Sequence, residues 1–190
     1  MAKRKGSKRA GSRQPEAITM LIEDHQKVQK MFKTFERTED QQQQEQLATQ
    51  ICNELTVHTQ IEEQVFYPAA REALDEEEAA LVDEASVEHQ VAKDLIEKIK
   101  QSRPHDEEYC ALVTVLGEYV NHHIQEEQKE LFPAVKKTEI DFEALAEEMQ
   151  QKKQELMSEM GMGEGEEMAM EGAMSRQQRG QSSRSRAANR

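Results

Sequence analysis

The sequence predicts an all-α protein: an up-down four-helix bundle with an extra C-terminal helix and disordered tails. Three observations lead to this fold class. The chain has no tryptophan, only eight glycines and four prolines, and it is rich in Glu, Gln, Ala, Leu and Met, which favour helices. Four segments carry apolar residues at the helical period of three to four positions. Finally, 190 residues are enough for one domain of ordinary size with length left for tails.

The first helix is expected to begin at Glu16, and the second to run from about Gln41 to Arg71. Each has one apolar face, which in a bundle turns toward the core. The first face consists of Ile18, Leu21, Ile22, His25, Val28, Phe32 and Phe35. The second consists of Leu47, Ile51, Leu55, His58, Ile61, Glu62, Val65 and Phe66.

Asp75 or a neighbour can start the third helix, Ser102–Pro104 breaks the chain, and the fourth helix is expected from about residue 105 to 136. The third face consists of Leu81, Ala85, His89, Ala92, Ile96 and Ile99. The fourth consists of Leu112, Val113, Leu116, Val120, His123, Glu127 and Leu131. A shorter amphipathic helix over residues 141–157 is expected to pack on the outside of the bundle through Phe142, Leu145, Met149 and Leu156.

The charge distribution divides the chain into a disordered basic arm (1–15), a helical domain (16–157) and a disordered Met/Gly/Arg-rich tail (158–190). Residues 1–13 carry six basic residues and residues 174–190 five arginines, without any acid. The remaining 14 basic and 38 acidic residues give the middle a net charge near -24. Because an acidic body repels nucleic acid, the tails are interpreted as solubilising arms that contact an acidic partner or nucleic acid at most weakly.

The sequence predicts a cytoplasmic protein without a transmembrane segment. No run approaches the ~20 apolar residues that span a bilayer, and the basic N-terminus lacks the apolar stretch of a signal peptide. Cys52 and Cys110 lack CxxC spacing and are interpreted as reduced thiols on helices.

Each of the four apolar faces carries one histidine: His25, His58, His89 and His123. An imidazole buried without a partner costs about 1–3 kcal/mol, and metal coordination removes that cost because neutral imidazole is a good ligand. Glu62 and Glu127 follow two of these histidines by four residues, on the same helix face. His122 is rotated by ~100° from its neighbour and His105 lies at a helix start, so both are expected outside the site.

An internal repeat strengthens the prediction of a metal site. HTQIEEQVFYPA (58–69) aligns with HIQEEQKELFPA (123–134) at an offset of 65, and Asp24-His25-Gln26 aligns with Glu88-His89-Gln90 at an offset of 64. Two helix pairs of one design, packed antiparallel, would bring four histidines and two glutamates into the core. Tyr119 could donate a hydrogen bond to this site, although a core tyrosine is the simpler interpretation, and Tyr67 and Phe132 are interpreted as core anchors.

With these motifs, the sequence resembles the hemerythrin family in its bacterial HHE cation-binding branch, over about residues 16–137. The resemblance implies a bundle of the hemerythrin type and a non-haem di-iron centre, in which carboxylates and an oxo or hydroxo group bridge two iron ions. The implied ligands are His25 and His58 for one iron, His89 and His123 for the other, and Glu62 and Glu127 as bridges.

This sequence departs from the oxygen-carrying members of the family at two positions. Lys93 stands where the carriers have a fifth histidine, and Glu127 replaces an aspartate. Water, Asp or Glu could fill the vacant position, Glu63 among them. An open position favours binding of, or reaction with, O2, nitric oxide or peroxide over simple oxygen carriage.

The sequence therefore favours a di-iron protein that senses, stores or detoxifies such a small molecule, and it leaves open whether peroxide or nitric oxide chemistry makes it an enzyme. One alternative is a ferritin-like di-iron enzyme or iron-handling protein. Proteins of that class use Glu-x-x-His spacing, whereas the order here is His-x-x-x-Glu. The other alternative, a metal-free structural bundle, leaves the matched placement of four histidines unexplained.

Overall fold

The computed structural model describes residues 14–104 and 106–162. Most of the predicted basic arm and Met/Gly/Arg-rich tail, together with His105, lies outside the described residues. The chain forms two units, Met1–Gln151 and Lys152–Arg190, and the four predicted bundle helices all lie in the first. No helix in the described part of the chain is long and apolar enough to cross a membrane.

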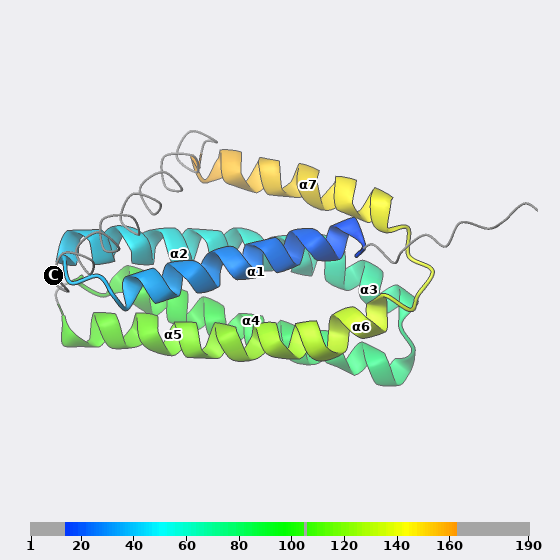
Figure 1. The fold of residues 1–190 in the computed structure, drawn as a ribbon, viewed down its shortest axis with the longest axis horizontal. Coiled ribbons are helices and arrows are strands. Elements are labelled where there is room, and N and C mark those ends of the chain that lie inside the picture. Colours follow the sequence, from blue (N-terminus) through cyan, green and yellow to red (C-terminus); the bar gives the residue numbers. More distant parts are fainter. Residues whose placement is uncertain (1–13, 105, 163–190) are drawn as a thin grey trace, which may run out of the picture. The chain divides into compact units, whose positions relative to one another are not determined.

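Four long helices lie lengthwise in the first unit (Figure 1). The helix α1 packs against α2 and α5, and α4 packs against α2 and α5, as expected for an up-down four-helix bundle. The elements in chain order are α1 (Glu16–Phe35), α2 (Gln41–Ile61), a π-helical turn η1 (Glu62–Phe66), α3 (Tyr67–Ala73), α4 (Glu76–Gln101), α5 (Glu107–Glu126), a second π-helical turn η2 (Glu127–Leu131), α6 (Phe132–Val135) and α7 (Phe142–Glu159). The predicted all-α bundle is confirmed.

The helix starts follow from local chemistry. Asp40 accepts a hydrogen bond from the backbone N–H of Gln43, and Asp75 accepts from those of Glu77 and Glu78. Such side-chain caps satisfy N–H groups that have no partner within the first helical turn. Asp75 therefore starts α4, which is one of the starts that the sequence allowed.

The predicted faces form the core, with small differences at their margins. Ile18, Leu21, Leu55 and Leu116 are almost completely buried, whereas Ile22, Leu47, Leu81 and Leu112 are only half-buried. The predicted fifth helix is observed as α7, where Leu145 and Met149 are buried; its packing on the outside of the bundle remains a prediction. Both cysteines are free thiols, and burial raises the pKa of Cys52 to about 11.

The main difference from the predicted elements is that the second and fourth helices are not regular throughout. The backbone N–H of Tyr67 donates to the carbonyl of Glu62, and that of Phe132 donates to the carbonyl of Glu127. Each bond spans five residues instead of four, which defines a π-helical turn. Both π turns begin at a repeated glutamate, and such turns occur frequently at functional sites.

Candidate metal centre

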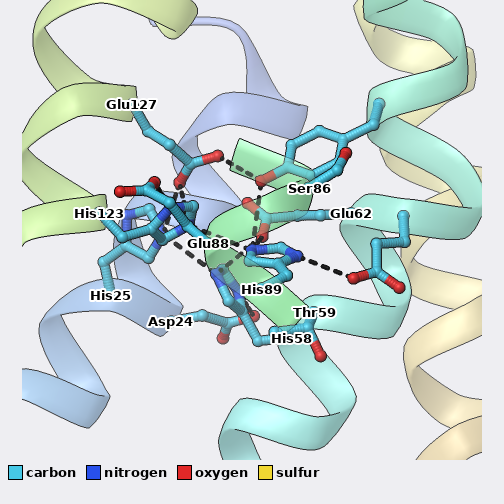
Figure 2. Close-up of polar contacts among 12 residues, drawn as sticks. Asp24, His25, His58, Thr59, Glu62, Ser86, Glu88, His89, His123 and Glu127 are labelled. Carbon is cyan, nitrogen blue, oxygen red and sulfur yellow. Dashed lines mark hydrogen bonds and ion pairs between the residues drawn. The ribbon is translucent and has the colours of Figure 1, made fainter. Parts of the chain in front are cut away.

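The six predicted ligands lie together in the bundle core (Figure 2). The histidines come from four different helices, and the glutamates are the first residues of the two π turns. All six side chains are buried, and Glu62 and His25 are fully inaccessible. The six residues are His25 (α1), His58 (α2), Glu62 (η1), His89 (α4), His123 (α5) and Glu127 (η2).

One half of the cluster is formed by the histidines of α1 and α2. The Nε2 atoms of His25 and His58 lie 3.0 Å apart. Glu62 Oε2 lies 3.1 Å from His58 Nε2, and Glu127 Oε2 lies 3.2 Å from His25 Nε2. The inward ring nitrogens and two carboxylate oxygens thus surround one position.

The other half is formed in the same way by the histidines of α4 and α5. The Nε2 atoms of His89 and His123 lie 3.1 Å apart. Here Glu62 Oε2 lies 3.2 Å from His89 Nε2, and Glu127 Oε2 lies 3.4 Å from His123 Nε2. The Oε2 atom of each glutamate therefore lies between one histidine of the first pair and one of the second, an arrangement compatible with cations that share the carboxylates.

The donor set fits metal ions on two grounds. Bonds of about 2.0–2.2 Å at right angles place neighbouring donor atoms about 3 Å apart, close to the separations observed. Within the described part of the chain, both carboxylate oxygens of Glu62 and the Oε2 atom of Glu127 are buried without a hydrogen-bond partner. Unpaired buried carboxylate oxygens are unfavourable, and a divalent cation would give them a partner.

A second layer of polar groups contacts the outer nitrogens of the imidazoles. Glu63 Oε1 lies 3.1 Å from His89 Nδ1, and Glu88 Oε2 lies 2.7 Å from His123 Nδ1. A carboxylate on the far ring nitrogen usually orients a metal-binding imidazole and strengthens it as a ligand. These contacts leave the Nε2 atoms directed into the centre.

This second layer follows the internal repeat. Asp24 and Glu88 directly precede the histidines of α1 and α4, and each faces the histidine of the next long helix: Asp24 Oδ2 lies 3.9 Å from His58 Nδ1, an ion-pair distance. Gln128 stands where Glu63 stands in the other repeat, and its Nε2 lies 3.3 Å from His25 Nδ1. The internal repeat aligns Asp24 with Glu88, but the sequence alone indicates no role for either residue.

Lys93 does not take the place of a ligand. Its Nζ atom donates to both carboxylate oxygens of Glu63, at 2.6 and 2.5 Å. Glu63 in turn contacts the outer nitrogen of His89 and not the inner one. The suggestion that Glu63 fills the vacant ligand position is therefore wrong: Lys93 and Glu63 form a charged pair behind His89.

Tyr67 is a polar group of the centre that the sequence pattern did not indicate. Its hydroxyl donates to Glu127 Oε1 at 2.9 Å and lies 3.2 Å from His89 Nε2. In a regular helix a residue five positions after Glu62 points about 140° away from it, so the helical period placed Tyr67 off the site. The π turn brings it back, and the only signal in the sequence was that the repeat has Tyr67 where its other copy has Phe132.

Replacing Tyr67 with Phe should weaken the metal centre without removing a ligand. The change deletes the hydrogen bond to Glu127 and installs the residue of the other repeat. Loss of an outer-layer group of this kind typically lowers metal affinity about 10–100-fold. Competition with a chelator measures the effect, and Tyr109→Phe, the same change near the start of α5, is the matched control. Equal chelator resistance of the Tyr67 variant and the native chain would show that the hydroxyl has no role at the centre.

The electrostatics of the metal-free centre separate the two glutamates. Burial and the nearby Glu127 raise the pKa of Glu62 well above its usual range. Burial acts in the same direction on Glu127, but the imidazoles of His123 and His25 outweigh it and lower the pKa of Glu127. Burial also lowers the pKa of His58 to about 4. Without metal, Glu62 therefore holds its proton more strongly than Glu127.

Metal binding should consequently release protons and weaken as the pH falls. At any pH below the raised pKa of Glu62, an incoming cation must displace the proton of that carboxyl group. Calorimetric titration of the metal-free chain in buffers with different ionisation enthalpies measures the protons released. Equal apparent heats in those buffers would contradict the assigned protonation of Glu62.

A small apolar cavity adjoins the four histidines. It measures about 20 Å³, which is enough for a water molecule or a diatomic. Its apolar walls come from Val28, Leu55, Ala92, Val120 and Ile124. Tyr119, predicted as a donor to the centre or a core residue, is half-buried and lines this cavity.

The fold and the site together define a four-helix bundle with a buried histidine–carboxylate cluster suited to cations. The sequence matches the family model described as the hemerythrin HHE cation binding domain over residues 16–135. The chain therefore belongs to the hemerythrin family of HHE domains, as its motifs suggested.

The chain is similar to two proteins with different descriptions. A protein of Nostoc sp. named DNA nickase is 33% identical over 114 residues, which cover 60% of this chain and 31% of the relative. An uncharacterized hemerythrin-like protein of Schizosaccharomyces pombe is 26% identical over 117 residues, or 62% of this chain and 58% of that protein. The chain thus spans well under two thirds of either relative.

A solved structure shares the fold. The crystal structure of a hemerythrin HHE cation binding domain-containing protein from Mycobacterium kansasii superposes with a TM-score of 0.63 at 20% identity. The match covers 74% of this chain and 86% of that one. At this identity the likeness shows the fold alone.

Proposed function

We propose that this chain is a non-haem di-iron protein that binds or reacts with O2, nitric oxide or peroxide, and so senses, stores or detoxifies one of them. The observation that carries the proposal is the position of the two glutamates. Glu62 Oε2 and Glu127 Oε2 each lie within 3.1–3.4 Å of one histidine from either pair. This geometry suits two cations that share both carboxylates.

The ligand types are compatible with iron, and the choice of iron itself follows from the resemblance to the hemerythrins. Imidazole suits iron, copper, nickel and zinc, whereas carboxylate-rich sites suit harder cations, so a mixed set favours a metal that accepts both. When bound, two irons would supply electrons to a small oxidising ligand such as O2 or peroxide. The cavity beside the histidines has the size and apolar walls for a diatomic.

The residues of the chain have separate tasks in this proposal. The four histidines and two glutamates hold the ions, and Glu88 and Glu63 orient His123 and His89. The Tyr67 hydroxyl is the hydrogen-bond donor inside the centre. The apolar cavity walls exclude bulk water, which strengthens electrostatic interactions inside.

Metal analysis of the purified full chain, combined with its optical spectrum, tests the proposal. We expect two irons per chain and the charge-transfer absorption of a coupled ferric pair. A single zinc ion, or metal below one equivalent after growth in iron-replete medium, would contradict a di-iron centre. The latter result would instead support the metal-free structural bundle.

A ferritin-like di-iron enzyme or iron-handling protein is the runner-up. Proteins of that class contribute one glutamate from each of two helices and a Glu-x-x-His motif from each of the other two. Here the four long helices each contribute one histidine, and the glutamates follow histidines by four residues. Catalytic oxidation of many ferrous ions per chain, with storage of the product, would favour the runner-up over the small-molecule role.

The substitution Lys93→His tests the departure from the oxygen carriers. It places an imidazole one turn after His89 and removes the partner that now holds Glu63. We expect the reduced, iron-loaded variant to show a new absorption band on exposure to O2 that decays more slowly than in the native chain. Lys98→His on the exposed part of the same helix is the control. Identical spectra for both variants would show that the residue at position 93 does not affect the reaction with O2.

We propose, secondly, that the basic tails make the weak contact with nucleic acid that the sequence predicts. One relative is named DNA nickase, and residues 1–13 and 174–190 carry eleven basic side chains without an acid. If the tails bind DNA, affinity should fall with rising salt in proportion to the phosphates neutralised. Removal of both tails should then abolish binding, and a tail-less chain that retains it would refute the idea.

A further inference from the structure

A third group of metal-ligating side chains lies outside the buried centre, between α4 and α5. Glu88, His122 and Glu126 each offer one donor atom, and these atoms all lie within 4.8 Å of one another. His122 Nε2 lies 3.2 Å from Glu126 Oε1, because the two residues stand four apart on α5. The side chains of His122 and Glu126 are 64% and 38% exposed, so solvent ions reach them.

The donor types define the ion. One imidazole and two carboxylates suit a divalent transition metal of intermediate hardness, whereas calcium and magnesium prefer oxygen ligands alone. Three protein ligands would leave the remaining positions to water, so an ion could enter and leave the site.

The surface cluster is linked to the buried centre by a shared residue. Glu88 contributes to the cluster, and its Oε2 also lies 2.7 Å from Nδ1 of the buried His123 (Figure 2). His122 and His123, adjacent on α5, thus belong to two different groups that Glu88 connects.

An acidic cavity provides a second connection. It measures about 30 Å³, lies between α4 and η2, and has room for a small ion with a water molecule. Its polar walls are Glu84, Glu88, Glu126, Glu127 and Glu130. Glu127 is only 2% exposed, and its Oε2 atom has no hydrogen-bond partner within the described part of the chain. The cavity is thus lined by surface acidic residues and by one residue of the buried centre.

The charge of these walls acts on a cation before it binds. A cleft lined with charges of one sign focuses the field and raises the local concentration and association rate of the opposite charge by about 10–10³-fold. The buried centre is enclosed by helices, and its six ligands are nearly inaccessible. An ion must therefore pass between helices, and this acidic cavity lies between two of the elements that contribute ligands to the centre.

We propose that Glu88, His122 and Glu126 form a surface site for a divalent transition-metal cation and that this site loads the buried centre through the acidic cavity. The inference rests on the proposed metal-binding function of the buried centre. It assigns a role to His122, which is otherwise an exposed histidine beside a ligand.

The first test counts ions. The full chain with both buried positions filled with iron is titrated with Co²⁺ and followed by calorimetry and cobalt absorption. We expect one further Co²⁺ per chain, bound at least about ten-fold more weakly by His122→Ala and by Glu126→Gln. Glu108→Gln, an exposed change of the same charge on α5, should bind like the native chain. If no further Co²⁺ binds, or if all variants bind it equally, the cluster is a surface ion pair and not a metal site.

The second test measures delivery. Metal-free chain is mixed with limiting Fe²⁺, and filling of the buried centre is followed by absorbance. We expect His122→Ala and Glu126→Gln to load about ten-fold more slowly than the native chain and the Glu108→Gln control, and to reach the same final iron content. Unchanged rates would overturn the loading role. A native chain that takes up no iron would refute the proposed function itself, whereas two irons without a further Co²⁺ would refute this inference alone.

Discussion

Replacing Glu127 with Gln should remove most of the bound metal and, with it, a large part of the thermal stability of the chain. The Oε2 atom of Glu127 contacts both His25 and His123, one histidine from each pair. The amide keeps the shape and the hydrogen bond to Tyr67 but loses the charge that a bridging ligand needs. His58→Ala should have the same effect, because it removes one of the two imidazoles of its pair.

The size of the effect follows from linkage between binding and folding. A ligand present at 1,000 times its dissociation constant stabilises the native state by about 4 kcal/mol, which corresponds to roughly 10 °C in Tm for a domain of this size. Iron content and differential scanning calorimetry, with and without chelator, measure both consequences. The Glu108→Gln control should keep its metal and its Tm. If Glu127→Gln and His58→Ala keep the iron content of the native chain, neither residue is a metal ligand.

Replacing Glu62 with Met should change stability in opposite directions with and without metal. In the metal-free chain, Glu62 is fully buried and neither carboxylate oxygen has a hydrogen-bond partner within the described residues. An unsatisfied buried polar group costs about 1–3 kcal/mol, and an unbranched apolar side chain of similar length removes that cost. We expect the metal-free variant to be more stable than the metal-free native chain by about that amount, and to gain nothing from iron.

Glu127→Met is the matched comparison for this experiment. Both glutamates lie against two imidazoles, but Glu127 alone of the two accepts a hydrogen bond from Tyr67, so its removal leaves the Tyr67 hydroxyl without that acceptor. Its metal-free form should be destabilised by about 1–3 kcal/mol. Chemical denaturation in the presence of chelator measures both variants. A loss of stability in metal-free Glu62→Met would mean that Glu62 supports the fold, and that its burial does not by itself indicate a ligand.

Much of this protein is determined by its sequence. The helical period of apolar residues located all four bundle helices, because burial of one face of a helix imposes that period. The repeat located the four histidines and two glutamates that the structure brings together, since residues at equivalent positions of paired helices reach the same level of the core. Asp75, as a side-chain cap, marked the start of α4 correctly.

Only the tertiary structure decided the rest of the centre. The π turns at Glu62 and Glu127 change the direction of all later side chains, and no single-helix period predicts them; this is why Tyr67 was assigned to the core although its hydroxyl lies in the centre. The partners of the outer ring nitrogens also come from neighbouring helices. Asp24 contacts Nδ1 of His58, and Glu88 contacts Nδ1 of His123. Such contacts depend on the rotation and register of the packed helices, which the sequence pattern of a single helix does not contain.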